Sequence, residues 1–491
     1  MTAIPALSSP LSATHAATRR VPRRAERTGL DLFRLCLSAG IVLNVSRIHQ
    51  IYPWLSALRP QLTLTFLSLV AAFMSRRALA SPAWTRHWLT KIIYALTAAA
   101  MASIAFGISQ GQAFWFFEEN YSKVLISCFL LMAATRDARD VRTFMWAYVV
   151  GAAILVWMAI FRFDLVMDNN GLARLANLET WDANDIGVLL LIGLGLCLLL
   201  FRTSGVWGKL CTAVVLVGIG DAMARSGSRG GFIGLGCVLL AFIVSLKHVH
   251  FARRISIVGL IAFSLFLAAP AGYWKQMSTI TAPKDDYNWS SAQGRRELAI
   301  RGMGYMMSYP IFGIGAGNFG RAELTISPLA GQTGIRESAA HNTYVQAGAE
   351  MGVPGFLLFI VLTLGGIVVP WRLRRKIPPS WRSGSPDEQF LFQAAMYLPL
   401  AAIGFAVPAY FVSFAYADPV YILAAMAVSL TCCVAAKTRL PRGDARPAAR
   451  RNDGFRGRRQ VARPRAVRLA STRVAAATRP PATRPTLPTP S

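Results

Sequence analysis

The sequence predicts an all-α integral membrane protein. Of its 491 residues, 54% are hydrophobic and only 15% are charged, and the mean hydropathy is +0.42. Apolar stretches of roughly 20 residues, the length that crosses about 30 Å of hydrocarbon, recur along the chain. These stretches are continuous and do not alternate with polar residues, so they favour membrane helices over the strands of a membrane barrel.

We expect about twelve transmembrane helices. Each corresponds to an uninterrupted apolar stretch bounded by charged or turn-forming residues. In chain order, the expected spans are residues 29–46, 61–75, 91–109, 120–135, 142–162, 184–202, 208–224, 230–247, 254–272, 353–371, 390–414 and 418–437.

Both ends of the chain are polar and lie outside a single membrane domain, residues 29–437. Residues 1–28 are basic and contain no short apolar segment with a cleavage site, so we expect a disordered cytoplasmic N-terminus and no signal peptide. Residues 438–491 are rich in Arg, Pro and Ala, and we expect a disordered cytoplasmic tail on the anionic membrane face. A partner-binding role for this tail is the alternative.

Lysine and arginine are distributed unevenly between alternate loops. Residues 76–91, 136–142, 247–254 and 372–382 are basic, whereas acidic residues gather in the loops between them. By the positive-inside rule, the basic loops and both termini face the cytoplasm. Residues 273–340 then form one large external loop, and loops of this length are usually functional.

The net charge of +29 does not indicate nucleic-acid binding, because the basic residues lie in loops and tails next to membrane lipid. The seven cysteines all fall within apolar stretches, so we expect small buried side chains and no disulfides. The spacing of His, Cys, Asp and Glu fits no metal site, and no phosphate-binding glycine motif follows a strand. The sequence therefore predicts neither a metal nor a cofactor.

Several candidate binding residues fall on the predicted external side. Arg225 and Arg229 flank a short run of Ser and Gly that joins two spans. A guanidinium beside the N-terminal amides of a helix suits a phosphate group. The alternative is an arginine that reaches the membrane surface without binding a ligand. Arg295 and Arg296, in the long loop, supply two further guanidinium groups.

The external loop closes on His341 and Asn342, directly before an apolar span. A histidine here is a candidate general base, and a packed interfacial histidine is the alternative. Asn184 opens an earlier span on the same side, where a helix cap explains it equally well. Glu350 lies too far along the helix to orient the His341 ring, so we expect it to have a structural partner.

Taken in order, these motifs resemble the O-antigen ligase family of bacterial inner-membrane proteins, which includes O-antigen polymerases and protein O-oligosaccharyltransferases. The resemblance covers about residues 180–370, and it departs from the family at Ala299, where many relatives carry a tryptophan. It rests on Asn184-Asp185, Ser228-Arg229-Gly230, Gly294-Arg295, Pro310-Ile311-Phe312-Gly313-Ile314-Gly315, His341-Asn342, and Glu350 with Gly352.

The resemblance implies a membrane glycosyltransferase (GT-C-like) fold in the bacterial inner membrane, with a periplasmic active face. It implies metal-independent, inverting transfer of a glycan from undecaprenyl pyrophosphate to a hydroxyl acceptor on lipid A core, a growing polysaccharide or a protein. Arg229 and Arg295 would hold the pyrophosphate, with Arg225 and Arg296 as further candidates. His341 would deprotonate or orient the acceptor hydroxyl, and Asn342 and Asn184 would support the site.

Two other classes of function stay open. The first is a transporter or exporter of polysaccharide or lipid-linked glycan, which would place charged or broken spans near mid-membrane. The second is a non-catalytic component of polysaccharide assembly. The polar motifs gather on one face instead, which favours the enzyme, while the sequence leaves the acceptor and the sugar open.

Overall fold

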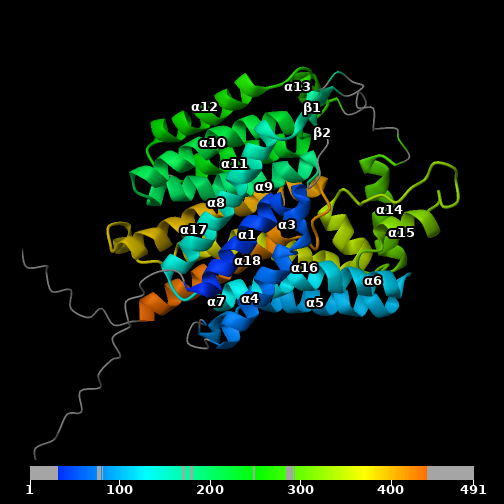
Figure 1. Cartoon of the computed structure of the whole chain (residues 1–491), viewed down its shortest axis with the longest axis horizontal. Coiled ribbons are helices and arrows are strands. Elements are labelled where there is room, and N and C mark those ends of the chain that lie inside the picture. The colour runs from blue at the N-terminus through cyan, green and yellow to red at the C-terminus, as the bar shows by residue number, and fades with distance from the viewer. Residues whose placement is uncertain are drawn as a thin grey trace, which may run out of the picture. The chain divides into compact units, whose positions relative to one another are not determined.

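The computed structural model describes residues 31–74, 79, 81–167, 171, 173–176, 181–246, 249–282, 291 and 293–439. Over these ranges the chain is mainly α-helical (Figure 1). The termini predicted to be disordered lie outside the described residues, except that Thr438 and Arg439 end the last helix. Two short strands, β1 (Asp164–Met167) and β2 (Ala173–Ala176), form an antiparallel hairpin that the all-helical prediction did not contain.

Nine helical segments in the described ranges are long and apolar enough to cross a membrane, which makes this a multi-pass membrane protein. They are Pro53–Met74 (α3, Pro53–Ala57, with α4, Pro60–Met74), Trp88–Phe106 (α5), Ala138–Phe161 (α8), Ala183–Thr203 (α9), Val206–Ser226 (α10), Phe251–Ala268 (α12), Thr343–Leu373 (α16), Pro386–Phe411 (α17, Pro386–Ala406, with η6, Pro408–Phe411) and Asp418–Arg439 (α18).

The remaining predicted spans are also helical, although twelve crossings stay a prediction. Two shorter apolar helices are α1 (Leu32–Ser46) and α11 (Arg229–Ser245). Another helical run joins α6 (Gln110–Phe116), the π-helical turn η3 (Phe117–Tyr121) and α7 (Ser122–Ala134). The short elements α2 (Ile48–Ile51), η2 (Pro82–Arg86) and η5 (Pro379–Arg382) lie in the connections.

Two helices end at different residues from those predicted, and polar or cyclic side chains explain both differences. Helix α16 begins at Thr343 and not at residue 353, because the Asn342 side-chain oxygen caps the N–H groups of Tyr344 and Val345. Helix α17 ends at Ala406 instead of residue 414, since Pro408 lacks the N–H that would continue it.

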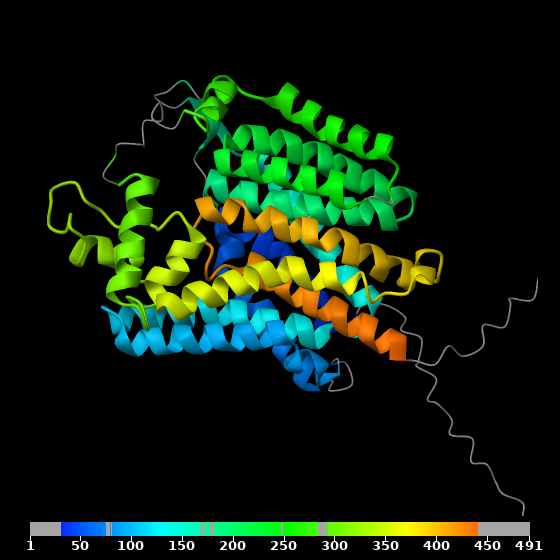
Figure 2. The ribbon, with the colours of Figure 1, turned by 180° about the vertical axis from the view of Figure 1, so that it is seen from behind.

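Helix α9 lies at the centre of the helical core. Its residues 186–200 are all buried, between α8, α10, α11 and α17. Gly195 permits this packing, because a Cβ there would lie 2.4 Å from the Ala401 nitrogen of α17. In Figure 2, α9–α12 lie on one side of α16–α18, and α5–α7 lie on the other.

The prediction of uniformly buried cysteines is wrong for Cys211. This residue is exposed on the outer face of α10, where lipid and not protein would surround it in a membrane. Cys237 and Cys432 are half-buried, whereas the other four are buried, and all seven are free thiols.

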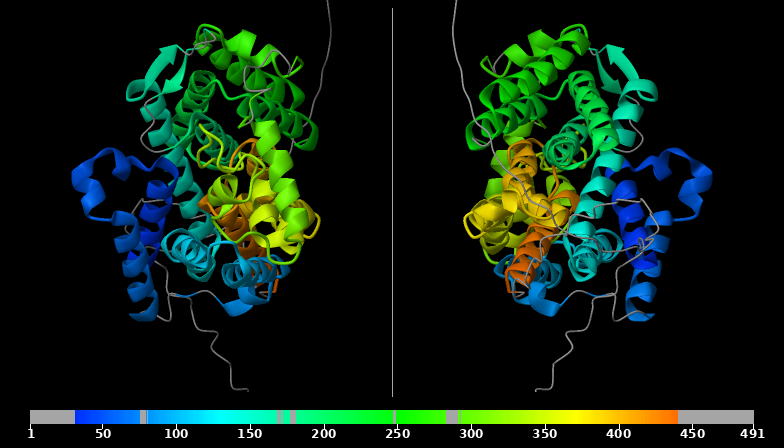
Figure 3. Two further views of the ribbon diagram at one scale, coloured as in Figure 1. Left: turned by 90° about the vertical axis from the view of Figure 1, so that its right-hand side faces the viewer. Right: turned by 90° about the vertical axis from the view of Figure 1, so that its left-hand side faces the viewer.

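Within the described part of the interval predicted as the long external loop lie the helices α13 (Tyr273–Ser278), α14 (Arg295–Ser308) and α15 (Phe319–Thr325). Helices α14 and α15 lie at one end of the bundle, next to the start of α16 (Figures 2 and 3). Arg301 of α14 binds the fully buried Glu323 of α15 through two nitrogens, at 3.0 and 2.6 Å. This paired ion bridge holds the two helices together.

Candidate functional site

His341 occupies the last turn before α16 in an unusual backbone conformation. Its φ of 47° lies in the left-handed region, which few residues other than glycine adopt. The backbone N–H of His341 donates to the Ser413 hydroxyl at 2.8 Å. Among the described residues, the imidazole has no hydrogen-bond partner. Such strain persists where the surroundings enforce it, and it is common at functional sites.

The surroundings that enforce this conformation are the non-helical segment between α17 and α18. The Thr343 hydroxyl donates to the carbonyl of Val412 at 2.8 Å and accepts the N–H of Phe414 at 3.0 Å. One turn later, the Gln346 side-chain oxygen accepts the N–H of Ala415 at 3.2 Å. These bonds fix the start of α16, and with it His341, relative to residues 412–415.

The electrostatic environment keeps the His341 ring neutral. Burial lowers the pKa of His341 most, the positive charge of Arg295 lowers it further, and the negative charge of Asp182 opposes both. Because the net shift is downward from a value already below 7, the imidazole is uncharged at neutral pH. A neutral imidazole can accept a proton.

Arg295 is the member of the arginine pair that faces this histidine. It is the first residue of α14 and is half-buried, and its charge acts on both His341 and Asp185. Arg296 is exposed and forms an ion pair at 2.6 Å with its neighbour Glu297. The structure therefore distinguishes the two predicted arginines by their surroundings.

Asn184 lies at the start of α9, next to Asp182, whose charge acts on His341. The Asp182 side chain accepts the backbone N–H of Asn184 at 2.8 Å and its side-chain amide at 2.9 Å. Asp185 completes a capping box with Asp182. Asn184 is thus bound to the carboxylate whose charge reaches His341.

Arg47 is a further charged residue near Asp185, and it was not among the candidates predicted from the sequence. Its guanidinium lies 3.3 Å from the centre of the Trp181 ring, and the charges of Asp185 and Asp418 act on it. The sequence offered one signal for Arg47. It directly follows the first predicted span, on the external side, where the positive-inside rule predicts few basic residues.

Arg225 and Arg229 lie at the turn between α10 and α11. Arg225 pairs with Asp221 of its own helix at 2.8 Å, whereas Arg229 donates to the Thr279 hydroxyl at 2.9 Å. A Cβ at Gly230 would meet the Phe411 ring at 2.5 Å, two residues before Ser413. The turn therefore packs against the segment that holds His341.

The proline–glycine turn of the loop supports α16 from the other side. Helix α16 is broken at Gly352, whose φ is 71°. The freed N–H of Val353 donates to the carbonyl of Pro310 at 2.8 Å. Glu350, which is fully buried, accepts the N–H groups of Gly317 at 3.0 Å and Phe319 at 3.1 Å. The expected structural partner of Glu350 is therefore the turn itself.

An apolar groove of about 430 Å³ runs between α14 and α16. Asn342, the neighbour of His341, lines it, and so does Ala299, one helical turn beyond Arg295. The small side chain at position 299 contributes to the open space. The other lining residues are Gly302, Met303, Met306, Tyr344, Val345, Phe356, Ile360, Thr363, Leu364 and Tyr410.

A polar cavity of about 750 Å³ lies next to the segment that binds the His341 backbone. Ser413, which binds the His341 backbone, lines it together with Gln346 and Arg47. Five of its lining side chains are carboxamides, and its acidic and basic groups are mixed. The carboxamides are Asn44, Gln50, Gln61, Asn120 and Gln346. The charged side chains are Arg47, Arg59, Lys123, Glu118, Glu119 and Asp418.

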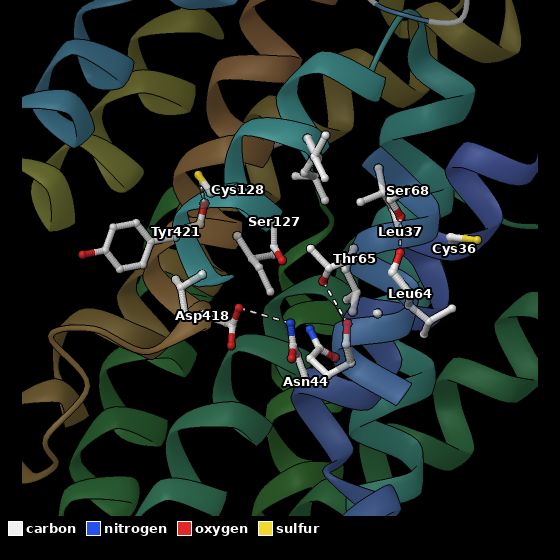
Figure 4. A pocket seen from close by; sticks show the side chains of 17 residues that line it. Cys36, Leu37, Asn44, Leu64, Thr65, Ser68, Ser127, Cys128, Asp418 and Tyr421 are labelled. Atoms are coloured by element: carbon white, nitrogen blue, oxygen red, sulfur yellow. Dashed lines mark hydrogen bonds between the residues drawn. The ribbon is translucent and has the colours of Figure 1, made fainter. Parts of the chain in front are cut away.

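The inner wall of the polar cavity is braced by hydrogen bonds between helices. Asn44 of α1 donates to Asp418 of α18 at 3.1 Å (Figure 4). Both residues also line a neighbouring void of about 20 Å³, large enough for one water molecule. The Tyr121 and Tyr421 hydroxyls, 2.9 Å apart, connect η3 to α18.

Within the described ranges, no three His, Cys, Asp or Glu residues are arranged to hold a metal ion. Two of the arginines predicted from the sequence, Arg295 and, at the adjoining turn, Arg229, carry their guanidinium groups in this region.

Comparison with known families finds a match to part of the chain. Residues 213–360 match the family model described as O-Antigen ligase, which confirms the resemblance predicted from the motifs. The matched region contains the α10–α11 turn, the loop helices, His341 and Glu350, but not Asn184. No curated protein matches the chain.

Proposed function

We propose that this chain, whose residues 213–360 match the O-antigen ligase family model, transfers a glycan from undecaprenyl pyrophosphate to a hydroxyl acceptor. One observation carries the proposal. A neutral histidine, faced by Arg295, lies where an apolar groove and a polar cavity approach the same segment. A lipid-linked sugar and a hydroxyl-rich acceptor require those two environments and a proton acceptor between them.

His341 acts as the general base in this proposal. Its neutral ring takes the proton of the acceptor hydroxyl as the acceptor oxygen attacks the anomeric carbon of the donor. The bond between the anomeric carbon and the phosphate oxygen breaks, and the electron pair leaves with undecaprenyl pyrophosphate. Attack opposite the leaving group inverts the anomeric centre.

Arg295 and Arg229 stabilise the leaving pyrophosphate. Negative charge grows on the bridging oxygen during bond breaking, and fixed guanidinium groups stabilise that charge in place of a metal ion. Arg225 and Arg296 are each paired with a neighbouring carboxylate, so we assign them supporting roles at most. Asn342 and Asn184 support the site indirectly, through the cap of α16 and through Asp182.

The apolar groove suits the isoprenoid chain of the donor. Arg295 begins the helix that forms one wall, so an anionic head group at that end would have its tail along Ala299 and Met303. The carboxamides of the polar cavity both donate and accept hydrogen bonds, as sugar hydroxyls do. We therefore favour a saccharide acceptor, either lipid A core or a growing polysaccharide, over a protein.

The cellular setting of the proposal is the bacterial inner membrane, with His341 on the periplasmic side. The bias of Lys and Arg towards the loops on the other side supports this orientation. It matches a donor whose glycan is displayed on the external leaflet and is consumed there.

A reconstituted assay tests the proposed function. The full chain is placed in liposomes with a lipid-linked oligosaccharide in one leaflet and a core-oligosaccharide acceptor outside. We expect a new glycosidic product and released undecaprenyl pyrophosphate in equal amounts. Movement of intact donor between leaflets without product would support a transporter, and neither outcome with correctly folded protein would support an assembly component.

A further inference from the structure

A further cavity with a distinct chemistry lies far from His341. This basic groove, of about 460 Å³, is formed by the ends of α16 and α18 and the start of α5. Arg372, Lys376 and His87 lie at its polar edge. Its apolar part includes Val369 and Val434, both almost completely buried.

The basic groove lies at the opposite end of α16 from His341. The part of α16 beyond its break at Gly352, residues 353–373, is about 31 Å long at a rise of 1.5 Å per residue. That length is close to the roughly 30 Å thickness of the hydrocarbon core of a bilayer. Figure 2 shows α16 running from the α14 end of the bundle to the other end. The groove therefore lies at head-group level in the leaflet opposite the candidate active site.

The charge of the groove is positive and uncompensated. None of its lining residues is acidic, and Arg372 and Lys376 form no ion pair with any residue in the described ranges. The neighbouring Arg374 and Arg375 are different, because their guanidinium groups stack on the Trp371 ring at 4.9 and 4.4 Å. The carbonyl ends of two helices stabilise such cations, but that effect alone does not require a cavity.

The aromatic edge of the groove adds a hydrogen-bond donor and a membrane-interface residue. The Nδ1 atom of His87 accepts the N–H of Leu89 at 3.2 Å, which leaves Nε2 to carry the ring proton. Trp88, 44% exposed, also lines the groove, and tryptophan is typical of the head-group level of a membrane.

We propose that the basic groove binds an anionic phospholipid. Arg372 and Lys376 contact the phosphate and its charged head group, and the apolar part receives the upper acyl chains. Free phosphate would leave that apolar part uncovered. The C-terminal segment, residues 441–491, is the nearest alternative occupant along the chain, but it is rich in arginine and would be repelled by the groove.

Lipid retention by the full chain tests this proposal. The protein is purified in mild detergent, mixed with equal amounts of phosphatidylglycerol and phosphatidylcholine, and examined by native mass spectrometry. We expect bound phosphatidylglycerol to exceed phosphatidylcholine about tenfold. The double variant Arg372→Gln/Lys376→Gln is expected to lose this preference. The matched control Arg374→Gln/Arg375→Gln removes the same charge from the Trp371 stack and is expected to keep it.

Two further measurements test whether the apolar part of the groove contributes to lipid binding and whether free phosphate can replace the lipid. Val368→Trp retains both cations but fills the apolar part of the groove, and it is expected to lower phosphatidylglycerol retention as well. Millimolar inorganic phosphate is expected not to displace the lipid. Equal loss of preference in both double variants, an absence of preference in the wild type, or displacement by phosphate would overturn the proposal.

Discussion

At the level of single residues, burial and two neighbouring charges determine the pKa of His341. Burial and Arg295 lower it, and Asp182 raises it, so the neutral base persists well into mildly acidic conditions. Because the folded-state pKa lies below the ordinary value, transfer activity should be full at pH 7 and should fall only as the pH drops through that lowered pKa.

Asp182→Asn tests this assignment without removing the helix cap, because asparagine is an equally good N-cap residue. Loss of the negative charge removes the one influence that raises the His341 pKa. The acid limb of the pH–rate profile should therefore move to lower pH, by on the order of half a unit. The measurement is the initial rate of glycan transfer between pH 4.5 and 8, and an upward shift or no shift would contradict the assignment.

Single residues were predicted from the sequence to different extents. His341, Arg295 and Asn184 were identifiable because polar residues beside apolar spans are conspicuous. The choice between Arg295 and Arg296 was not, because it depends on which side of α14 faces His341. Arg47 escaped notice because its partners, Trp181 and Asp185, are remote in sequence.

At the level of elements, the break in α16 is central to the site. The proline–glycine turn fills the break, and Glu350 binds the backbone of the turn. These hydrogen bonds connect the turn to the first part of α16. A change in the conformation of the turn should therefore alter the position of His341.

Gly352→Ala should destabilise the protein by about 2 kcal/mol or more. Position 352 has a φ of 71°, and an added Cβ would lie 2.6 Å from the carbonyl oxygen of Pro310. Gly366→Ala in the same helix is the control, since its Cβ would meet only the Ala402 side chain at 3.6 Å. Thermal unfolding in detergent should show a lower Tm for the first variant only, and equal Tm values would refute this account of the break.

Met303→Glu tests the apolar groove as the donor-lipid site. The substitution introduces a charge into the groove at a side chain that is 45% exposed, so folding should be retained. The KM for the lipid-linked donor should rise about tenfold or more, with little change in the KM for the acceptor. Met307→Glu, one turn further along α14 and outside the groove, should leave both values near wild type.

Most elements could be predicted from hydrophobic length alone, but their ends could not. The start of α16 depends on the Asn342 cap, and the π-helical turn within residues 110–134 has no hydrophobic signature. The β1–β2 hairpin was missed because its strands, Asp164–Met167 and Ala173–Ala176, are only four residues long.

For the whole molecule, the main expectation is that the two ends of the bundle face opposite compartments. Cysteines introduced at exposed positions in a cysteine-free background test it. Gln332→Cys, in the loop that precedes His341, should react with a membrane-impermeant maleimide in intact spheroplasts. Ser383→Cys, between α16 and α17, should react only after permeabilisation. The reverse pattern would invert the proposed orientation.

The class of the molecule was evident from composition and span length, and the resemblance of residues 213–360 to the O-antigen ligase family was evident from the order of the motifs. The apolar groove, lined by Asn342, and the polar cavity, lined by Ser413, were not predictable. They are formed by helices distant in sequence, such as α14 with α16 and α1 with α18, and their volume depends on how side chains pack.

The most direct test of the central claim is the initial rate of glycan transfer by purified His341→Gln in liposomes. Glutamine retains a polar side chain but cannot act as a base near neutral pH. His250→Gln, an exposed histidine before α12, is the matched control. We predict a loss of at least about 100-fold for His341→Gln, with donor binding retained, and a wild-type rate for the control. A correctly folded His341→Gln protein that transfers glycan at the wild-type rate would contradict the account.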